Sequence, residues 1–212
     1  MAGKRELRRE LLLFSHEMNQ QAQVRSQLER DLRKAIVNQE FEVYYQPLVS
    51  LHNQAVTGAE ALIRWHHPQQ GLISPARFIP LAEETGLIVP IGRWVLAQVC
   101  EQLKQWRDDA DLSIRVAVNL SAKQCLGPEG VETVCSVIVG SQVDTSRLVI
   151  EITESMLMED KQSLSALRQL RALGVKLSMD DFGTGYSSLS YLKHFPIDIL
   201  KIDRAFVNPD IS

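Results

Sequence analysis

The sequence has little cysteine, few aromatic residues and almost no excess of charge of either sign. Its three cysteines, Cys100, Cys125 and Cys135, form no C-x-x-C pair, which argues against a disulfide framework and a structural zinc site. With 23 Lys and Arg against 26 Asp and Glu, the net charge is −3, so nothing favours duplex nucleic acid as a partner. No apolar run approaches the about 18 residues that a membrane-spanning helix needs. We therefore expect a cytoplasmic chain with free thiols and no membrane span.

What the sequence does contain is typical of a globular protein. Of its 212 residues, 45% are hydrophobic and 23% are charged, which is enough apolar mass for a real core. This length suits one large domain or two small ones.

The first 36 residues differ in pattern from the rest. No Pro or Gly interrupts residues 6–39, which predicts an amphipathic linker or signalling helix over residues 1–36. Its apolar residues recur at alternating spacings of four and three: Leu7, Leu11, Phe14, Met18, Leu28, Leu32 and Ala35. Polar Gln21 and Arg25 break this seam. The helix therefore either packs on its own domain or forms a dimerising or signal-relaying coil, and the two interpretations are about equally supported.

From Phe41 onward, short β-rich runs alternate with longer helical stretches. Residues 41–51 and 55–65 read as an opening antiparallel pair of strands. Helices are predicted at 75–85, 92–108, 130–141, 160–173 and 187–194, and strands at 114–120, 148–153, 176–179 and 199–202. This order predicts an α/β fold whose parallel strands form either a doubly wound sheet or a barrel.

Polar side chains directly follow the short apolar runs of the predicted strands. They are Glu60, Asn119, Glu151, Asp180, Asp181 and Lys201. In a β/α barrel the carboxyl ends of successive strands meet at one mouth, so we expect these groups in one pocket. A single acidic residue at such a place is more often solvated or a helix cap, but capping explains so many poorly. Asp203, two residues beyond Lys201, is set aside as a cap.

Clustered carboxylates repel one another, and a divalent cation is the usual way to hold several of them ionised. Their hard oxygen ligands favour Mg²⁺ or Mn²⁺ over zinc. Two such ions suit phosphodiester hydrolysis, with a lysine that neutralises charge or moves a proton. The glycines of Asp181-Phe182-Gly183-Thr184-Gly185 predict a mobile loop beside the site. Although Asp-Phe-Gly also occurs in protein kinases, the chain lacks their glycine-rich loop and His-Arg-Asp motif.

These motifs together resemble one known family. The segment Gly58-Ala59-Glu60-Ala61-Leu62-Ile63-Arg64-Trp65 resembles the signature of EAL-domain cyclic di-GMP phosphodiesterases. Further motifs of that family match in order and spacing: Tyr45-Gln46-Pro47, Asn119-Leu120-Ser121, Glu151-Ile152-Thr153-Glu154, Asp180-Asp181-Phe182-Gly183-Thr184-Gly185 and Lys201-Ile202-Asp203. The resemblance implies a TIM-like barrel with an antiparallel first strand, two Mg²⁺ or Mn²⁺ ions, and hydrolysis of cyclic di-GMP to linear pGpG.

The resemblance also implies a role for each matching residue. The metal ligands would be Glu60, Asn119, Glu151, Asp180 and Asp181. Lys201 would contact the attacking water and act with Glu60, Asp180 and Asp181 as the catalytic set, while Glu154 would anchor the glycine loop. The dinucleotide would be contacted by Gln46, Leu62 and Arg64.

The family pattern continues beyond Lys201-Ile202-Asp203 with two further strand-helix units. We therefore expect residues 37–212 to form an EAL domain that lacks those units and holds about six of the eight strands of a closed barrel. The resemblance also implies an upstream sensory or GGDEF domain in relatives, and a homodimer is a further expectation. The alternative to an enzyme is a catalytically inactive remnant that binds cyclic di-GMP or acts as a protein-interaction module.

Overall fold

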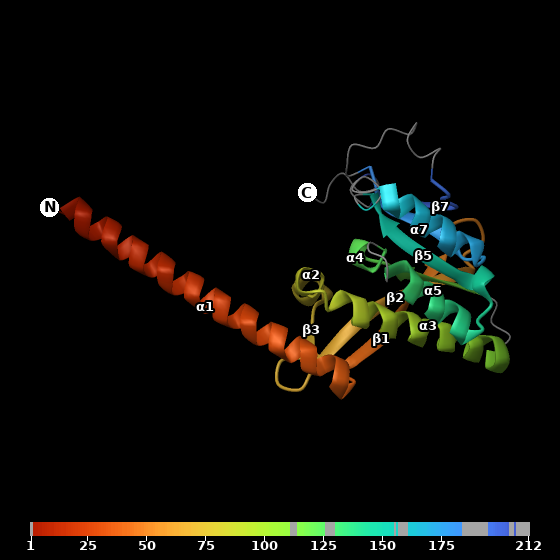
Figure 1. Ribbon diagram of the computed structural model, residues 1–212, viewed down its shortest axis with the longest axis horizontal. Coiled ribbons are helices and arrows are strands. Elements are labelled where there is room, and N and C mark those ends of the chain that lie inside the picture. The colour runs from red at the N-terminus through yellow and green to blue at the C-terminus, as the bar shows by residue number, and fades with distance from the viewer. Residues whose placement is uncertain are drawn as a thin grey trace.

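The computed structural model describes residues 2–110, 114–125, 130–154, 156, 161–183, 195–203 and 206, with side chains outside 2–17, 109–110 and 161–163. Fourteen elements follow one another along this part of the chain (Figure 1). They are α1 (Ala2–Asn38), β1 (Phe41–Val49), β2 (Val56–His67), β3 (Gly71–Ile73), α2 (Pro75–Thr85), α3 (Ile88–Ala110), β4 (Arg115–Asn119), α4 (Ala122–Cys125), α5 (Gly130–Ser141), η1 (Thr145–Arg147), β5 (Leu148–Thr153), α7 (Lys161–Ala172), β6 (Lys176–Phe182) and β7 (Ile199–Ile202).

One sheet organises the body of the molecule. Its path is β1-β2-β4-β5-β6-β7, with β3 paired to β2 as a short hairpin. β1 runs antiparallel to β2, whereas each later pair on the path is parallel. The expected α/β architecture with an antiparallel first strand is thereby confirmed. Because β1 and β7 are the ends of the path, the strands that the structure describes form an open arc of a barrel.

The helices pack on one face of this arc, as Figure 1 shows for α3, α5 and α7. The parallel strands are apolar on both faces, because one face meets these helices and the other lines the barrel interior. On β5, for example, Leu148, Ile150 and Ile152 are at most 1% exposed, while the alternate residues Val149 and Glu151 are 4% and 2% exposed. The carboxylate of Glu151 is thus held among buried neighbours.

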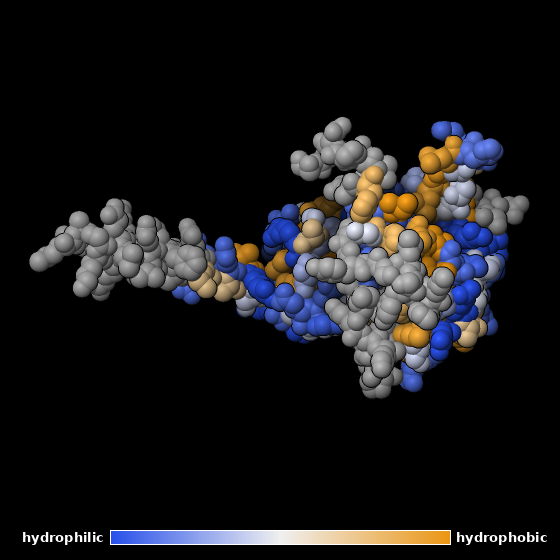
Figure 2. Space-filling view, turned by 90° about the horizontal axis from the view of Figure 1, so that it is seen from above, coloured by the Kyte–Doolittle hydropathy of each residue, from blue (hydrophilic) through white to orange (hydrophobic). Residues whose placement is uncertain are grey.

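α1 is a 37-residue helix that extends from the body as an arm (Figure 1). Its last turns pack on the domain, where Leu28, Leu32 and Ala35 are buried. Farther out, Met18 and Val24 are 57% and 60% exposed, and Figure 2 shows hydrophobic patches among hydrophilic ones on this part of the arm. Both sequence interpretations of the helix therefore keep support: its end packs on its own domain, and the outer seam has apolar residues free for a coil.

Polar contacts add to this docking of α1. Asp31 lies 3.5 Å from Nε2 of His67, whose side chain is 3% exposed. Nδ1 of His67 accepts the backbone N–H groups of Gln69 and Gln70, so the ring presents its other nitrogen, Nε2, to the helix. Just beyond α1, Glu40 accepts a 2.9 Å hydrogen bond from Nε1 of Trp65. These contacts tie the arm to the tip of β2.

Element boundaries differ from the sequence predictions in a few places. β3 was not predicted, because a strand of three residues carries no period of its own. β6 continues through Asp180 and Asp181 to Phe182, where the prediction ended it before these polar residues. The predicted helix 187–194 lies outside the described residues. No helix in the described ranges is both long and apolar enough to cross a membrane.

Candidate active site

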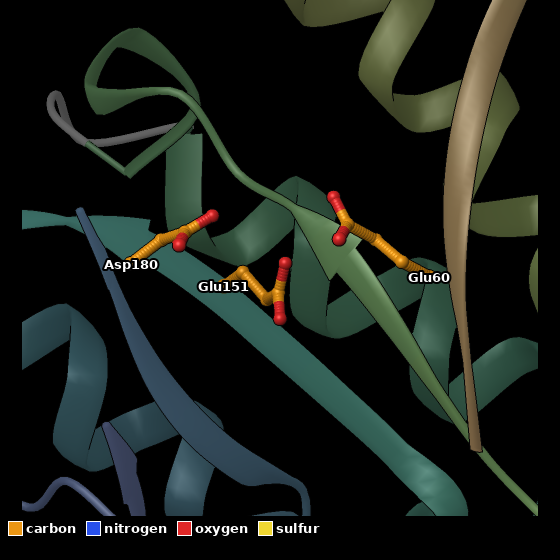
Figure 3. Close-up of side chains that lie close together, drawn as sticks. All are labelled: Glu60, Glu151 and Asp180. Carbon is orange, nitrogen blue, oxygen red and sulfur yellow. The ribbon is translucent and has the colours of Figure 1, made fainter. Parts of the chain in front are cut away.

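Three carboxylates from three strands meet at the carboxyl end of the parallel sheet. Glu60 comes from β2, Glu151 from β5 and Asp180 from β6, and one oxygen of each lies within 4.8 Å of the others (Figure 3). The register explains the meeting: Thr153 pairs with Asp180, and Asn119 with Glu151, so the strands end at similar heights. The structure therefore brings together residues that are up to 120 positions apart in the sequence, which is the separation of Glu60 and Asp180.

Lys201 of β7 lies among these carboxylates. Its Nζ donates to Glu151 Oε2 at 2.8 Å, to Glu60 Oε2 at 3.0 Å and to Asp180 Oδ2 at 3.1 Å. An ammonium group has three donors, and all three are used here. The lysine thereby supplies the positive charge that the clustered carboxylates need.

Burial and charge act in opposite directions on the acidity of these groups. Burial raises the pKa of Glu151, although the ammonium of Lys201 works against this rise. Burial alone would lower the pKa of Lys201, but its hydrogen bonds to Glu151 and Glu60 outweigh that effect and raise the pKa above its usual value. In this arrangement Lys201 is an ammonium group at neutral pH and is not poised to accept a proton.

Asn119 joins the cluster from β4. Its Nδ2 donates to Oε1 of Glu60 at 3.0 Å. Since Glu60 also accepts from Lys201 through Oε2, both of its oxygens are held. The nitrogen of the Asn119 amide is thus occupied, and the atom it has to offer a cation is its oxygen.

Asp181 follows Asp180 on β6 but is not one of the three clustered carboxylates. It is exposed, lies at a positive φ of 54°, and its backbone N–H donates to Oδ1 of Asp180 at 2.9 Å. Burial, followed by the charges of Asp180 and Asp203, raises the pKa of the Asp181 carboxyl. Asp203, which the sequence analysis set aside as a cap, therefore lies close to Asp181 at the rim. The signal that could have found it is its place in the sequence, two residues after Lys201 and directly beyond the end of β7.

Glu154 contacts the start of the glycine segment, which comprises residues 183–185. It is 8% exposed, and its Oε2 accepts the backbone N–H of Gly183 at 3.4 Å. Gly183 has a φ of 100°, a conformation that suits glycine alone. Glu154 is thus bonded to the backbone at Gly183, and residues 184–194 lie outside the described residues.

The three residues expected to contact a dinucleotide share one face of the β1-β2 pair. Glu60, Leu62 and Arg64 are two residues apart along β2, so they lie on the same face of the strand. Gln46 of β1 pairs directly with Glu60 of β2. The guanidinium carbon of Arg64 lies 5.3 Å from the ring centre of Tyr44, a residue that the sequence analysis did not single out. This cation-π contact holds Arg64 at the rim of the site.

A cavity of about 760 Å³ opens beside the carboxylates. Its wall includes Leu62, Arg64, Asn119, Glu151 and, from α2, Glu83. Leu62 and Arg64 therefore line the same cavity as Asn119 and Glu151. Glu83 is a second residue that the sequence analysis passed over, because nothing in its local pattern distinguishes it from a solvated helix carboxylate.

Comparison with known proteins places this geometry in a family. The family described as "EAL domain" matches residues 29–212. This chain belongs to the EAL domain family. The match covers the sheet, its helices and the last turns of α1.

Relatives of this EAL domain include two curated proteins. Over 196 residues it is 48% identical to "Bifunctional diguanylate cyclase/cyclic di-GMP phosphodiesterase MucR" of Pseudomonas aeruginosa, which covers 92% of the chain and 29% of that protein. It is 43% identical to "Cyclic di-GMP phosphodiesterase PdeR" of Escherichia coli, over 94% of the chain and 30% of that protein. The chain therefore spans less than a third of the length of these relatives.

A solved structure described as "PaMucR Phosphodiesterase, c-di-GMP complex" is also similar to this EAL domain. The two superpose with a TM-score of 0.81 at 49% identity, over 86% of this chain and 74% of the other. A second, "Structure of EAL Enzyme Bd1971 - cGMP bound form", gives a TM-score of 0.83 at 37% identity, over 97% and 57% of the respective chains. The fold described above is therefore the fold of solved EAL domains.

Proposed function

We propose that this EAL domain hydrolyses cyclic di-GMP to linear pGpG with the aid of divalent metal ions. The observation that carries the proposal is the meeting of Glu60, Glu151 and Asp180 around Lys201 at the carboxyl end of the sheet. This end of a β/α barrel is where active sites are built. The named activity of the similar MucR and PdeR proteins, and the cyclic di-GMP complex among the similar structures, support the same substrate.

The donor set fits a hard cation. Glu60, Asn119, Glu151, Asp180 and Asp181 offer only oxygen atoms, which favours Mg²⁺ or Mn²⁺ as the ions, two in a complete site. When bound, such ions would lower the pKa of a bound water and neutralise charge on the phosphate. Asp181, beside Asp180 at the rim, is the ligand that the three-carboxylate cluster does not yet include.

Lys201 would serve this chemistry as a cation. Its raised pKa keeps its proton, and in this structure all three of its donors go to carboxylates. To orient a water, Lys201 would turn one of these donors from a carboxylate to the water. It would also offset negative charge that develops on the phosphate. Glu154 would keep the start of the glycine segment beside the site through its bond to Gly183.

Substrate contacts would come from the face that β1 and β2 share. Arg64 would pair with a phosphate or a base edge, with its guanidinium held by the Tyr44 ring. Leu62 would pack against the dinucleotide, and Gln46 would hydrogen-bond to it next to Glu60. The cavity of about 760 Å³ lies within the size range of small-ligand pockets, about 300–1,000 Å³.

Domain bounds, dimerisation and cellular location are part of the same proposal. Residues 1–36 would be a linker or signalling helix and 37–212 the EAL domain, with homodimerisation through the exposed seam of α1 around Met18. A cytoplasmic location is consistent with three free cysteines, Cys100, Cys125 and Cys135. Light scattering tests the dimer, and a strictly monomeric mass would count against it.

The activity is tested by incubating the purified chain with cyclic di-GMP and Mg²⁺ or Mn²⁺ and separating the products by chromatography. We expect pGpG from the wild type and none above background from Glu60→Ala. Glu101→Ala is the matched control, because Glu101 is an exposed carboxylate on α3, away from the cluster. No product from the wild type would refute the proposal for this chain. Binding of cyclic di-GMP without turnover, measured by calorimetry, would support the alternative of a non-catalytic binder.

A further inference from the structure

A carboxylate of α2 contacts the loop that directly follows Asn119. Oε1 of Glu83 accepts a hydrogen bond from the Ser121 hydroxyl at 2.8 Å. Both side chains are half-buried, and Ser121 lies two residues beyond Asn119, between β4 and α4. The bond joins segments 38 residues apart in the sequence.

The backbone around Ser121 is held on its other sides. The N–H of Leu120 donates to the carbonyl of Glu151 at 2.8 Å. The N–H of Ser121 donates to Oε1 of Gln124 at 3.1 Å, and the N–H of Gln124 donates to the Ser121 carbonyl at 2.9 Å. Ser121 to Gln124 therefore form the start of α4 with a glutamine reaching back to the capping residue.

Gln124 is itself fixed by a close packing contact. It is 5% exposed and lies against Gly92 of α3. A Cβ placed on Gly92 would lie 1.9 Å from Nε2 of Gln124, so glycine is needed there for the amide to fit. The Ser121 hydroxyl takes no part in these bonds, and its acceptor is Glu83 of α2.

The bond also lies in the wall of the cavity beside the carboxylates. Glu83, Ser121 and Asn119 all line this cavity. The neighbouring Glu84, in contrast, forms an ion pair with Arg25 of α1. Of these two adjacent carboxylates of α2, Glu84 contacts α1 and Glu83 contacts the loop beside the site.

We propose that Glu83 is a positioning residue, which acts through the Ser121 hydroxyl to hold the Asn119 amide against Glu60. This inference rests on the metal site of the proposed function. Asn119 donates to Glu60 at 3.0 Å from the last position of β4, and the loop that Glu83 contacts begins at the next residue. Without the Glu83 contact the loop keeps only a longer bond to α2, from Lys123 Nζ to the Glu84 carbonyl at 3.4 Å, and the amide oxygen of Asn119 is presented less precisely. Partners of this kind in metal sites typically change metal affinity or activity by about 10- to 100-fold when they are removed.

The test measures Mn²⁺ affinity of the full chain by electron paramagnetic resonance, together with kcat and KM for cyclic di-GMP. We expect Glu83→Ala and Ser121→Ala each to weaken Mn²⁺ binding about tenfold, and the double variant to be no weaker than either. Glu83→Gln keeps an acceptor oxygen and should restore most of the affinity. Glu84→Gln, on the next residue of the same helix, is the matched control and should bind as the wild type does.

Urea unfolding of each variant separates positioning from stability. Glu83→Ala with a lowered unfolding midpoint but unchanged Mn²⁺ affinity would overturn the inference, because the bond would then be merely structural. Losses that add in the double variant would also overturn it, since the two residues would act independently. If Glu83→Ala weakens Mn²⁺ binding although the wild type makes no pGpG, the inference is supported and the proposed hydrolysis is refuted. No Mn²⁺ binding by the wild type would overturn both.

Discussion

Replacing Lys201 by methionine removes the positive charge at the centre of the carboxylate cluster. Methionine has a similar length and no charge, so Glu60, Glu151 and Asp180 would face one another without a counter-ion. Breaking a buried ion pair by removing one partner costs about 3–5 kcal/mol. Glu151 is 2% exposed, but Lys201 and Asp180 are 27% and 24% exposed, so we expect the lower end, about 3 kcal/mol.

The assay is urea unfolding in EDTA, followed by tryptophan fluorescence, to which the buried Trp65 contributes with Trp94 and Trp106. We expect Lys201→Met to be about 3 kcal/mol less stable than the wild type, which corresponds to a fall in melting temperature of about 6–12 °C. Lys104→Met is the matched control, because Lys104 pairs with exposed Glu101 within one helix and its loss should cost less than about 0.5 kcal/mol.

Excess Mg²⁺ extends the same experiment. A ligand at about 100 times its dissociation constant stabilises a protein by about 2.7 kcal/mol. The cation should stabilise Lys201→Met more than the wild type, because it replaces the missing charge without competing with an ammonium group. The gap between the two proteins should therefore narrow. Equal stabilities in EDTA would refute the reasoning about Lys201, and a gap that Mg²⁺ leaves unchanged would refute the idea that the cluster holds a cation.

Three further outcomes are expected. Burial alone would raise the pKa of Asp198, but a backbone N–H and Lys176 hydrogen-bond to it and lower the pKa, so its stabilisation is present above the unfolded value of about 3.9 and lost as the pH falls further. Asp198→Asn should accordingly cost about 1.5–3 kcal/mol at neutral pH and less in acid, and a constant difference in urea unfolding across that range would contradict this. Burial raises the pKa of the Cys125 thiol to about 12, so this thiol should resist a disulfide reagent at pH near neutral and react once urea unfolds the chain. Gly92→Ala should lower the urea midpoint, because its Cβ would overlap the Gln124 amide, and an unchanged midpoint would show that the amide moves freely.

Much of the local structure follows from sequence periodicity. The prediction of a helix at 75–85 agrees with α2, where Pro75 begins the helix and Gly86, in the left-handed conformation, ends it. The polar residues at the ends of apolar runs were also predicted to share one mouth, and the register of β4, β5 and β6 confirms this for Asn119, Glu151 and Asp180. These features depend on neighbours in the chain, which is why a sequence reveals them.

Other parts could not be predicted, because their causes lie in distant segments. The end of β6 was placed too early, since Asp180 and Asp181 read as loop residues; pairing of Asp180 with Thr153 on β5 keeps them in the strand. For α1 the seam left two interpretations equally supported, and only the burial of Leu28 against the domain showed that its end packs there.

The sequence by itself determined the α/β class, the family and the identity of the polar residues at the strand ends, because each depends on local spacing and residue type. Tertiary structure alone decided how those residues are held. It set Lys201 between carboxylates 21, 50 and 141 positions away, and Glu83 against Ser121 across 38 positions. Hydrogen bonds over such separations depend on strand register and helix packing, which no local pattern encodes.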